Sequence, residues 1–243
     1  MGYFLQAYHG SNGDGPLERN WEPSVTVAVA NDTNDWGVAD RLSQIVHADG
    51  SGSHVTLERL SRGGAALRDI ADALHQLCTL HGRHPGVVDL ATSATNNPAA
   101  DDWLAQAGAA FVEERAYLIR VAAAAGPPPG TPGQAAAEAA LATQRNAIDL
   151  LSRSIRPGCA LGAAIAVALD WPVIRRPLDA AAERMGIDVI PCTLPSLAQT
   201  RQLIEAVACN AAVERAMTFG VQQLLAQHRG LWDLVAARAE SRG

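Results

Sequence analysis

Apolar residues recur at intervals of three and four over most of the chain from Ser61 onward. The first such stripe consists of Leu67, Ile70, Leu74 and Leu77, and further stripes lie within residues 104–121, 141–155 and 203–224. These intervals place side chains on one face of an α-helix. The pattern therefore predicts an all-α fold, in which residues 61–243 form one antiparallel bundle domain of about five to seven helices.

Residues 1–60 lack this regularity. A polar opening that contains several glycines is followed by a short β-like run at Ser24–Ala30. Trp36–Val46 fits one amphipathic helix, which should end before the turn signal at Asp49–Gly52. We expect residues 1–60 to form an irregular N-terminal arm that contains one short helix.

Three local signals predict where helices begin. Asn97 and Pro98 combine an N-cap residue with a proline at the first helical position. Thr131–Gln134 and Ser196–Gln199 have the spacing of a capping box, in which two side chains satisfy backbone N–H groups at the start of a helix. The second box should open the longest helix, which continues through Asn210 to residue 224.

Glycine and proline mark the predicted helix ends. Pro85 and Gly86 should stop the helix that carries His81, and Gly186 fits a C-terminal cap. Pro177 removes a backbone N–H from a helical segment, so it should break or restart that segment. The bundle should therefore contain several helices of moderate length.

Composition favours helices and narrows the range of functions. Alanine is abundant and aromatic residues make up 5% of the chain, which suits closely packed helices better than a sandwich or a barrel. A net charge of -6 without a basic cluster argues against a nucleic-acid partner. All 19 basic residues are arginines, so mechanisms that need a lysine, such as Schiff-base catalysis, are excluded.

The N-terminus and the apolar stretches bear on the cellular compartment. Met1–Asp14 has neither the basic start nor the apolar segment of a secretory signal. The longest apolar stretch, Cys159–Leu169, is shorter than the roughly 20 residues that span a bilayer. The four cysteines are widely spaced, and we expect them to be reduced. These features predict a cytoplasmic protein without a membrane partner.

Polar side chains interrupt the apolar stripes at His81, Glu114, Gln144, Asn210 and Glu214. A buried carboxylate is costly unless it is protonated, paired with a cation or bound to a metal. His81, Glu114 and Glu214, together with His84, are a chemically sensible ligand set for iron, manganese or zinc. Gln144 and Asn210 would then donate hydrogen bonds behind the ligands or contact a substrate.

An alternative interpretation of the same residues needs no metal. Each inward glutamate can pair with an arginine, and the candidates are Arg115, Arg120, Arg145 and Arg215. The familiar catalytic signatures, such as His-Glu-x-x-His, Gly-x-Ser-x-Gly and the Walker sequence, are absent. The residues alone leave both interpretations open.

Long antiparallel helices with inward Glu and His residues resemble the ferritin-like and heme-oxygenase-like bundles over roughly residues 65–230. The resemblance implies a di-iron or heme site, with Glu114 and Glu214 as inward carboxylates and His81 as an inward imidazole. No glutamate is followed three residues later by a histidine, so the ferritin-like Glu-x-x-His motif is absent. Two segments, His81–Gly86 and Arg156–Trp171, resemble an uncharacterised bacterial helical family.

Two functions are compatible with these features. The prediction is a scaffold or a regulatory or interaction protein, with a homodimer formed through the N-terminal arm or through the small residues Gly158, Gly162 and Ala166, which recur every four positions. The alternative is a metal-dependent oxidoreductase that uses the buried Glu and His residues on a small organic substrate in the bundle core.

Overall fold

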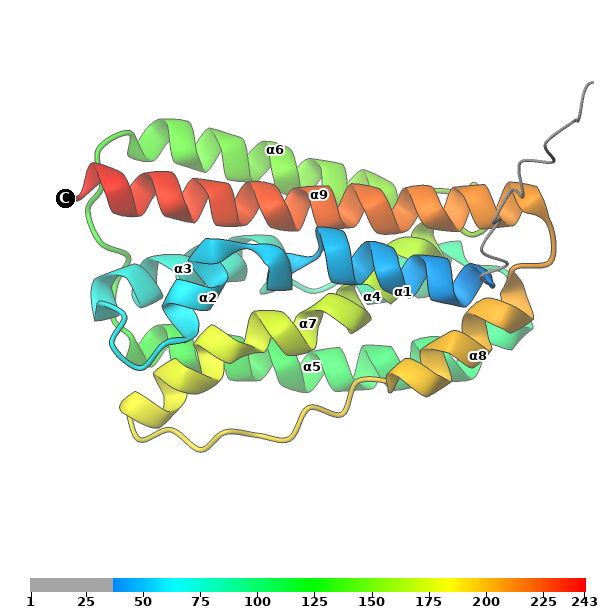
Figure 1. The fold of residues 1–243 in the computed structure, drawn as a ribbon, viewed down its shortest axis with the longest axis horizontal. Helices are drawn as coiled ribbons and strands as arrows, with labels where there is room; N and C mark the ends of the chain where they lie inside the picture. Colours follow the sequence, from blue (N-terminus) through cyan, green and yellow to red (C-terminus); the bar gives the residue numbers. More distant parts are fainter. Residues whose placement is uncertain (1–36) are drawn as a thin grey trace, which may run out of the picture. The chain divides into compact units, whose positions relative to one another are not determined.

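The computed structural model describes residues 37–243, and over these residues it contains nine α-helices, two 3-10 helices and no strand (Figure 1). In chain order the elements are α1 (Val38–Asp49), η1 (Ser51–Ser53), α2 (Val55–Ser61), α3 (Leu67–His81), α4 (Val87–Ala94), η2 (Pro98–Ala100), α5 (Asp101–Ala124), α6 (Gln134–Ser152), α7 (Cys159–Arg184), α8 (Leu197–Val207) and α9 (Ala211–Ser241). The predicted all-α fold is confirmed. The β-like run at Ser24–Ala30 lies outside the described residues.

Two short helices raise the helix count above the predicted five to seven. α2 has 7 residues and α4 has 8, which is too short for an apolar stripe to stand out in the sequence. Both nevertheless bury apolar side chains, including Leu57 and Leu60 from α2 and Val88 from α4. The helices from α1 onward belong to one unit, Trp36–Gly243, which begins upstream of the domain boundary expected at residue 61.

The predicted helix ends are partly confirmed. Ser196 and Gln199 form the capping box at the start of α8, and Gly186 follows α7 with a φ of +68°, a conformation that favours glycine. The box at Thr131 is wrong, because α6 begins at Gln134 without a side-chain cap. The Thr131 hydroxyl instead donates to the Pro129 carbonyl and accepts hydrogen bonds from Arg238 of α9 and from Arg242, which follows α9.

The predicted break at Pro177 is also wrong, because α7 continues for 26 residues through Pro172 and Pro177. An internal proline costs a helix about 3 kcal/mol. Most of α7 is buried, including Trp171, Ile174 and Leu178, so the packing of this helix outweighs that cost.

A different helix is interrupted where the pattern predicted continuity. α8 ends at Val207, and α9 begins at Ala211 with Asn210 as its N-cap. The Asn210 side chain accepts hydrogen bonds from the backbone N–H groups of Ala212 and Val213. Asparagine favours this position because its short side chain competes for backbone donors. Asn210 therefore starts a helix at the surface and does not point into the bundle.

α7 and α9 lie side by side and run in the same direction (Figure 1). A Cβ atom at Gly162 would lie 2.2 Å from the Met217 carbonyl oxygen, and one at Gly220 would lie 2.1 Å from the Cys159 carbonyl oxygen. Only glycine permits this approach. The small-residue face of α7, which includes the fully buried Ala166, thus packs inside the chain. The homodimer predicted through this face is wrong for that reason.

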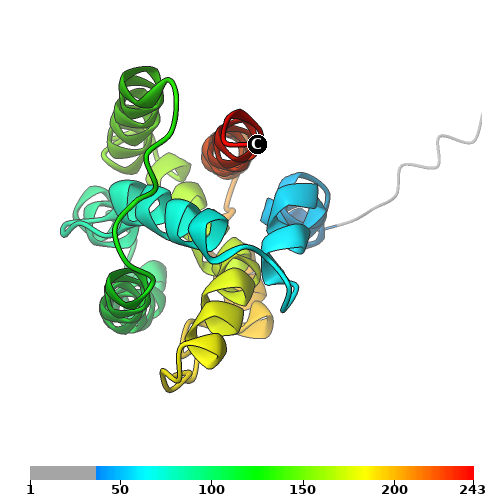
Figure 2. The same ribbon diagram turned by 90° about the vertical axis from the view of Figure 1, so that its left-hand side faces the viewer.

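α9 also lies between α6 and α1 in the end-on view (Figure 2). No described helix is both long enough and apolar enough to cross a lipid bilayer. All four cysteines are free thiols, as predicted.

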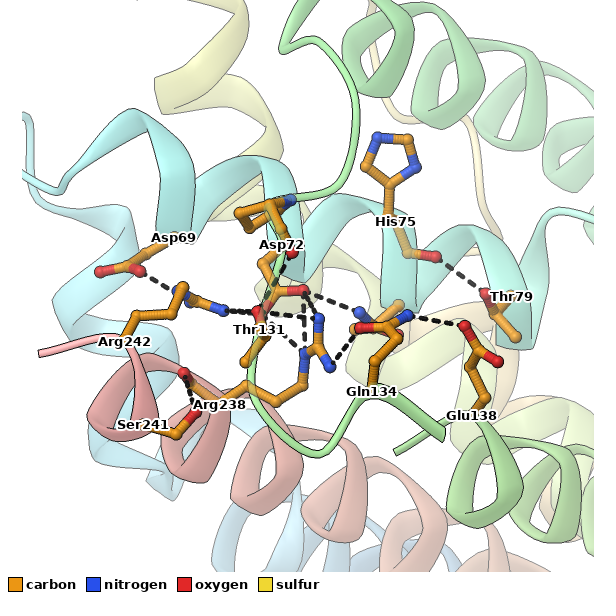
Figure 3. A network of polar contacts seen from close by, with 12 residues as sticks. Asp69, Asp72, His75, Thr79, Thr131, Gln134, Glu138, Arg238, Ser241 and Arg242 are labelled. Carbon is orange, nitrogen blue, oxygen red and sulfur yellow. Dashed lines mark hydrogen bonds and ion pairs between the residues drawn. The ribbon is translucent and has the colours of Figure 1, made fainter. Parts of the chain in front are cut away.

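A buried ionic cluster joins the C-terminal end of α9 to α3 (Figure 3). Its centre is Asp72, which accepts hydrogen bonds from Arg238 at 2.9 to 3.0 Å, from Arg242 at 2.6 Å and from Gln76 at 2.8 Å. Thr131 and Gln134, from the start of α6, complete the contacts of Arg238. We call these six residues the Asp72 cluster.

The electrostatics of the Asp72 cluster favour the carboxylate. Burial alone raises the pKa of Asp72, but hydrogen bonds from Arg238, Arg242 and Gln76 and the charge of Arg238 outweigh burial and hold this pKa below its ordinary value. Asp72 is fully buried, and the Arg238 side chain is 4% exposed. The pairing therefore holds α3 and α9 in one register.

Removing the Asp72 carboxylate should destabilise the fold. In Asp72→Ala, two arginines lose their buried counterion, which should lower the free energy of unfolding by about 3 kcal/mol. Asp69→Ala is the matched control, because Asp69 contacts only Arg242 of the pair and is less buried. Urea denaturation followed by circular dichroism measures both variants. Equal effects would show that the Asp72 cluster does not fix α9.

Candidate functional site

Four buried side chains form a continuous line of hydrogen bonds at the centre of the bundle. The Ser51 hydroxyl donates to Asp170 Oδ2 at 2.6 Å, and the Ser51 backbone N–H donates to Asp170 Oδ1 at 2.8 Å. His228 Nδ1 lies 2.7 Å from Asp170 Oδ2, and His228 Nε2 lies 3.0 Å from His81 Nε2. We call Ser51, Asp170, His228 and His81 the buried polar chain.

Each member comes from a different element. Ser51 starts η1, Asp170 lies in α7, His228 in α9 and His81 at the last residue of α3. All four are 0 to 2% exposed. Aromatic rings enclose His81, whose ring centroid lies 5.5 Å from that of Trp171 and 6.4 Å from that of Phe111. The hydrogen bonds of the buried polar chain therefore lie in low-dielectric surroundings, where they are stronger than in water.

The contact between the two histidines requires one proton between two Nε2 atoms. Because His228 Nδ1 faces the Asp170 carboxylate, its proton is assigned to that bond. With one proton on each ring, His81 donates from Nε2 to the unprotonated Nε2 of His228, and both imidazoles are neutral. Burial, followed by the charges of His228 and Arg115, holds the pKa of His81 well below its ordinary value. The arrangement thus holds one proton in each of the two hydrogen bonds that link His81, His228 and Asp170.

Asp170 also lines a pocket, so the buried polar chain reaches a cavity wall at this residue. The pocket has a volume of about 860 Å³ and lies against α1, η1, the middle of α7 and residues 192–197. Apolar side chains such as Val46, Val173 and Leu194 contribute to its lining, together with Arg176 and His47. We call it the α7 pocket. Ligand pockets in proteins typically measure about 300 to 1,000 Å³.

A second polar cluster is centred on Glu114, which bonds to Trp171, the residue after Asp170, and to Arg175. Glu114 Oε2 accepts a hydrogen bond from Trp171 Nε1 at 2.9 Å, and Glu114 Oε1 accepts one from Arg175 Nη1 at 2.8 Å. Arg175 also donates to Asp179 and to the Ile190 carbonyl. Glu114 and Arg175 are 1% and 3% exposed. The glutamate–arginine pairing is therefore present for Glu114, although Arg175 was not among the expected partners.

Tyr117 completes this second cluster. Its hydroxyl donates to Asp179 at 2.9 Å, and the Arg175 guanidinium lies 4.9 Å from the centroid of its ring. Burial, then the hydrogen bond and charge of Asp179, raise the pKa of Tyr117 above its ordinary value. Apart from Arg175 Nε, which is buried without a hydrogen-bond partner among the described residues, the polar groups of this cluster bond to one another or to the backbone, which suits a structural role.

Breaking the buried pair should be costly. Glu114→Ala leaves the Arg175 charge and the Trp171 N–H without their partner, so the free energy of unfolding should fall by about 3 kcal/mol. The control is Glu113→Ala on the exposed face of α5, which should change stability by less than about 0.5 kcal/mol. Thermal and urea denaturation test the pair, and a similar small effect for both variants would contradict this reading of Glu114.

The structure separates most of the residues predicted to bind a metal. His81 and Glu114 both contact Trp171, His81 through its ring and Glu114 through the indole N–H. His84 is exposed beside Asp89, and Glu214 is 31% exposed and pairs with Arg41. Among residues 37–243, no three or more His, Cys, Asp or Glu side chains are grouped as metal ligands would be. The four residues proposed as ligands thus do not converge.

The two predicted supporting residues also lie apart. Asn210 is exposed at the start of α9. Gln144 is half-buried on α6 next to Gly230, and its Oε1 atom is buried without a hydrogen-bond partner among the described residues. Neither residue belongs to the buried polar chain.

Sequence reasoning missed Ser51, Asp170 and His228. Asp170 had a visible signal, because it is the only charged residue in the apolar stretch from Cys159 to Ile174. His228 lies four residues after Leu224 on the same apolar stripe of α9. Ser51 gave no signal beyond a turn, since its role depends on where η1 meets α7.

Acid should destabilise the fold through His81. The unfolded chain binds a proton at this residue below about pH 6.5, whereas the folded chain resists it, so stability falls as the pH drops below 6.5. The loss from His81 between pH 7 and pH 5.5 should be about 1 kcal/mol. Urea denaturation of the wild type at the two pH values measures it.

His81→Gln should remove this part of the pH dependence, although the variant also loses stability at pH 7. His84→Gln, at an exposed histidine, should retain the wild-type drop between the two pH values. A drop that persists unchanged in His81→Gln would show that His81 is not its source.

The chain belongs to a family of unknown function, DUF6975, whose model matches residues 46–243. The match includes both segments, 81–86 and 156–171, that resemble an uncharacterised helical family. Comparison with curated proteins and with solved structures gave no match. The resemblance to ferritin-like and heme-oxygenase-like bundles stays a prediction.

Proposed function

We propose that this chain is a regulatory protein that binds a small organic molecule in the α7 pocket. The observation that carries the proposal is the position of Asp170, which lines this pocket and also belongs to the buried polar chain. The proposal keeps the predicted regulatory role. It moves the predicted organic ligand from the bundle core to a pocket beside α7.

The lining of the α7 pocket supports binding of a partly apolar molecule. Val46, Val173, Leu194 and Leu197 offer apolar surface, whose burial by a ligand is favourable by about 25 cal/mol per Å². A small number of polar side chains among them can orient the ligand. This mixture is typical of sites that select a small molecule.

We favour ligand binding over the predicted oxidoreductase activity because the buried polar side chains already bond to one another. Glu114 is neutralised by Arg175, and His81 lies behind His228, away from the pocket wall. Asp170 already accepts three hydrogen bonds from Ser51 and His228. A ligand at the pocket wall therefore lies next to Asp170, whose hydrogen bond to His228 connects the wall with the core.

A neutral fluorescent probe tests the proposed binding site. N-phenyl-1-naphthylamine gains fluorescence in apolar surroundings, and we expect it to bind the protein in the α7 pocket. Val173→Trp introduces a large ring at the pocket wall and should weaken probe binding by about tenfold, which corresponds to 1.4 kcal/mol. The measurement is a fluorescence titration at constant pH.

Val112→Trp provides the matched control, because Val112 is an exposed residue of α5 and does not line the α7 pocket. This variant should bind the probe like the wild type. Probe binding that is absent, or that responds equally to both substitutions, would contradict a binding site at the α7 pocket.

A further inference from the structure

We infer that the ligand of the α7 pocket is an organic anion, with an apolar body and one carboxylate or sulfonate group that Arg176 binds. This inference rests on the proposed function and adds the chemical class of the ligand. It comes from the charges that line the pocket and from the partners that those charges have.

Arg176 lines the pocket and forms no hydrogen bond or ion pair with any described residue. Its neighbour Arg175 shows the opposite behaviour, because Glu114, Asp179 and the Ile190 carbonyl occupy its guanidinium. The two adjacent arginines of α7 thus differ in role. Arg175 neutralises buried carboxylates, whereas the guanidinium of Arg176 remains available to a molecule in the pocket.

Two other polar side chains of the lining, His47 and Asp170, differ in their partners. His47, from the last turn of α1, also lines the pocket and has no polar partner among the described residues. Asp170 is the one acidic residue of the lining, and its oxygens are already engaged by Ser51 and His228. A ligand therefore meets the side chains of Arg176 and His47, which have no partner among the described residues, and one carboxylate that is already bonded to Ser51 and His228.

The start of α8 strengthens the same preference. Ser196, its N-cap, and Leu197, its first residue, line the pocket. The N-terminal end of a helix carries a partial positive charge, which favours an anion nearby. This contribution is secondary to the guanidinium of Arg176.

The whole chain carries a net charge of -6, so a basic pocket is not explained by a generally basic surface. An arginine guanidinium matches a planar carboxylate through two parallel hydrogen bonds. The apolar residues Val46, Val173 and Leu194 would cover the rest of such a molecule. Together these groups fit an amphipathic anion better than a neutral compound or a cation.

Two probes that differ only in charge test the inference. 8-anilino-1-naphthalenesulfonate has the same ring system as N-phenyl-1-naphthylamine and carries an additional sulfonate. We expect the sulfonate probe to bind the wild type about tenfold more tightly than the neutral one at low ionic strength, and added salt should reduce the difference. Fluorescence titrations with both probes measure the preference.

Arg176→Gln should bring the affinity for the anionic probe close to that for the neutral probe and leave the neutral probe unaffected. His47→Ala should weaken the anionic probe by a smaller factor, about twofold to threefold, because it removes a hydrogen-bond donor from the pocket lining. Arg153→Gln is the control, because Arg153 is an exposed arginine at the end of α6 that does not line the α7 pocket. Circular dichroism verifies the fold of each variant.

The outcomes separate this inference from the proposed function. Equal binding of the two probes, or an anionic probe that responds to Arg153→Gln and not to Arg176→Gln, overturns the anion specificity. If the neutral probe still responds to Val173→Trp in that case, the α7 pocket remains a binding site. If neither probe responds to Val173→Trp, both conclusions are wrong.

Discussion

The contact between Asp72 and the arginines of α9 fixes how α3 and α9 lie against each other. Asp72 and His81 are nine residues apart on α3, and Arg238 and His228 are ten residues apart on α9. At 1.5 Å per residue these separations are about 14 and 15 Å along antiparallel helices, so the ionic contact at one end matches the histidine contact at the other. Burying a carboxylate is tolerated here because two guanidinium groups surround it. A polar contact at the end of the bundle thus determines the geometry at its centre.

The glycine contacts between α7 and α9 fix the position of a third helix, α7, against the pair formed by α3 and α9. Gly162 and Gly220 let the two helices approach until backbone atoms touch, several residues before the position where Asp170 meets His228. Dispersion and hydrogen bonding both require such short distances. α9 is therefore held by charge against α3 and by close packing against α7. The buried polar chain follows from these two constraints, because its members come from the same three helices and from η1, which is hydrogen-bonded to Asp170.

The sequence predicts the positions of the helices better than it predicts which helices and side chains contact one another. Regular apolar spacing indicates an all-α fold, and the inward positions of His81 and Glu114 follow from the same spacing. Glu214 was misplaced because Asn210 begins a new helix, which puts this glutamate in the exposed first turn of α9. The continuity of α7 through Pro177 depends on burial by other helices, which local propensity does not contain. For the same reason no local pattern could join Ser51 to Asp170, 119 residues away.

Asp170 links the α7 pocket to the hydrogen bonds between the histidines in the core. This carboxylate lines the α7 pocket, and its hydrogen bond to His228 is also the first step toward His81. An anion bound near Arg176 would add negative potential at Asp170. Negative potential opposes the effect of burial on the pKa of His81, since it stabilises the charged form of an imidazole. By linkage, protonation of His81 would in turn favour the bound anion. The rings of Trp171 and Phe111 pack against His81 and exclude water there, so a charge at Asp170 is only weakly screened from this imidazole.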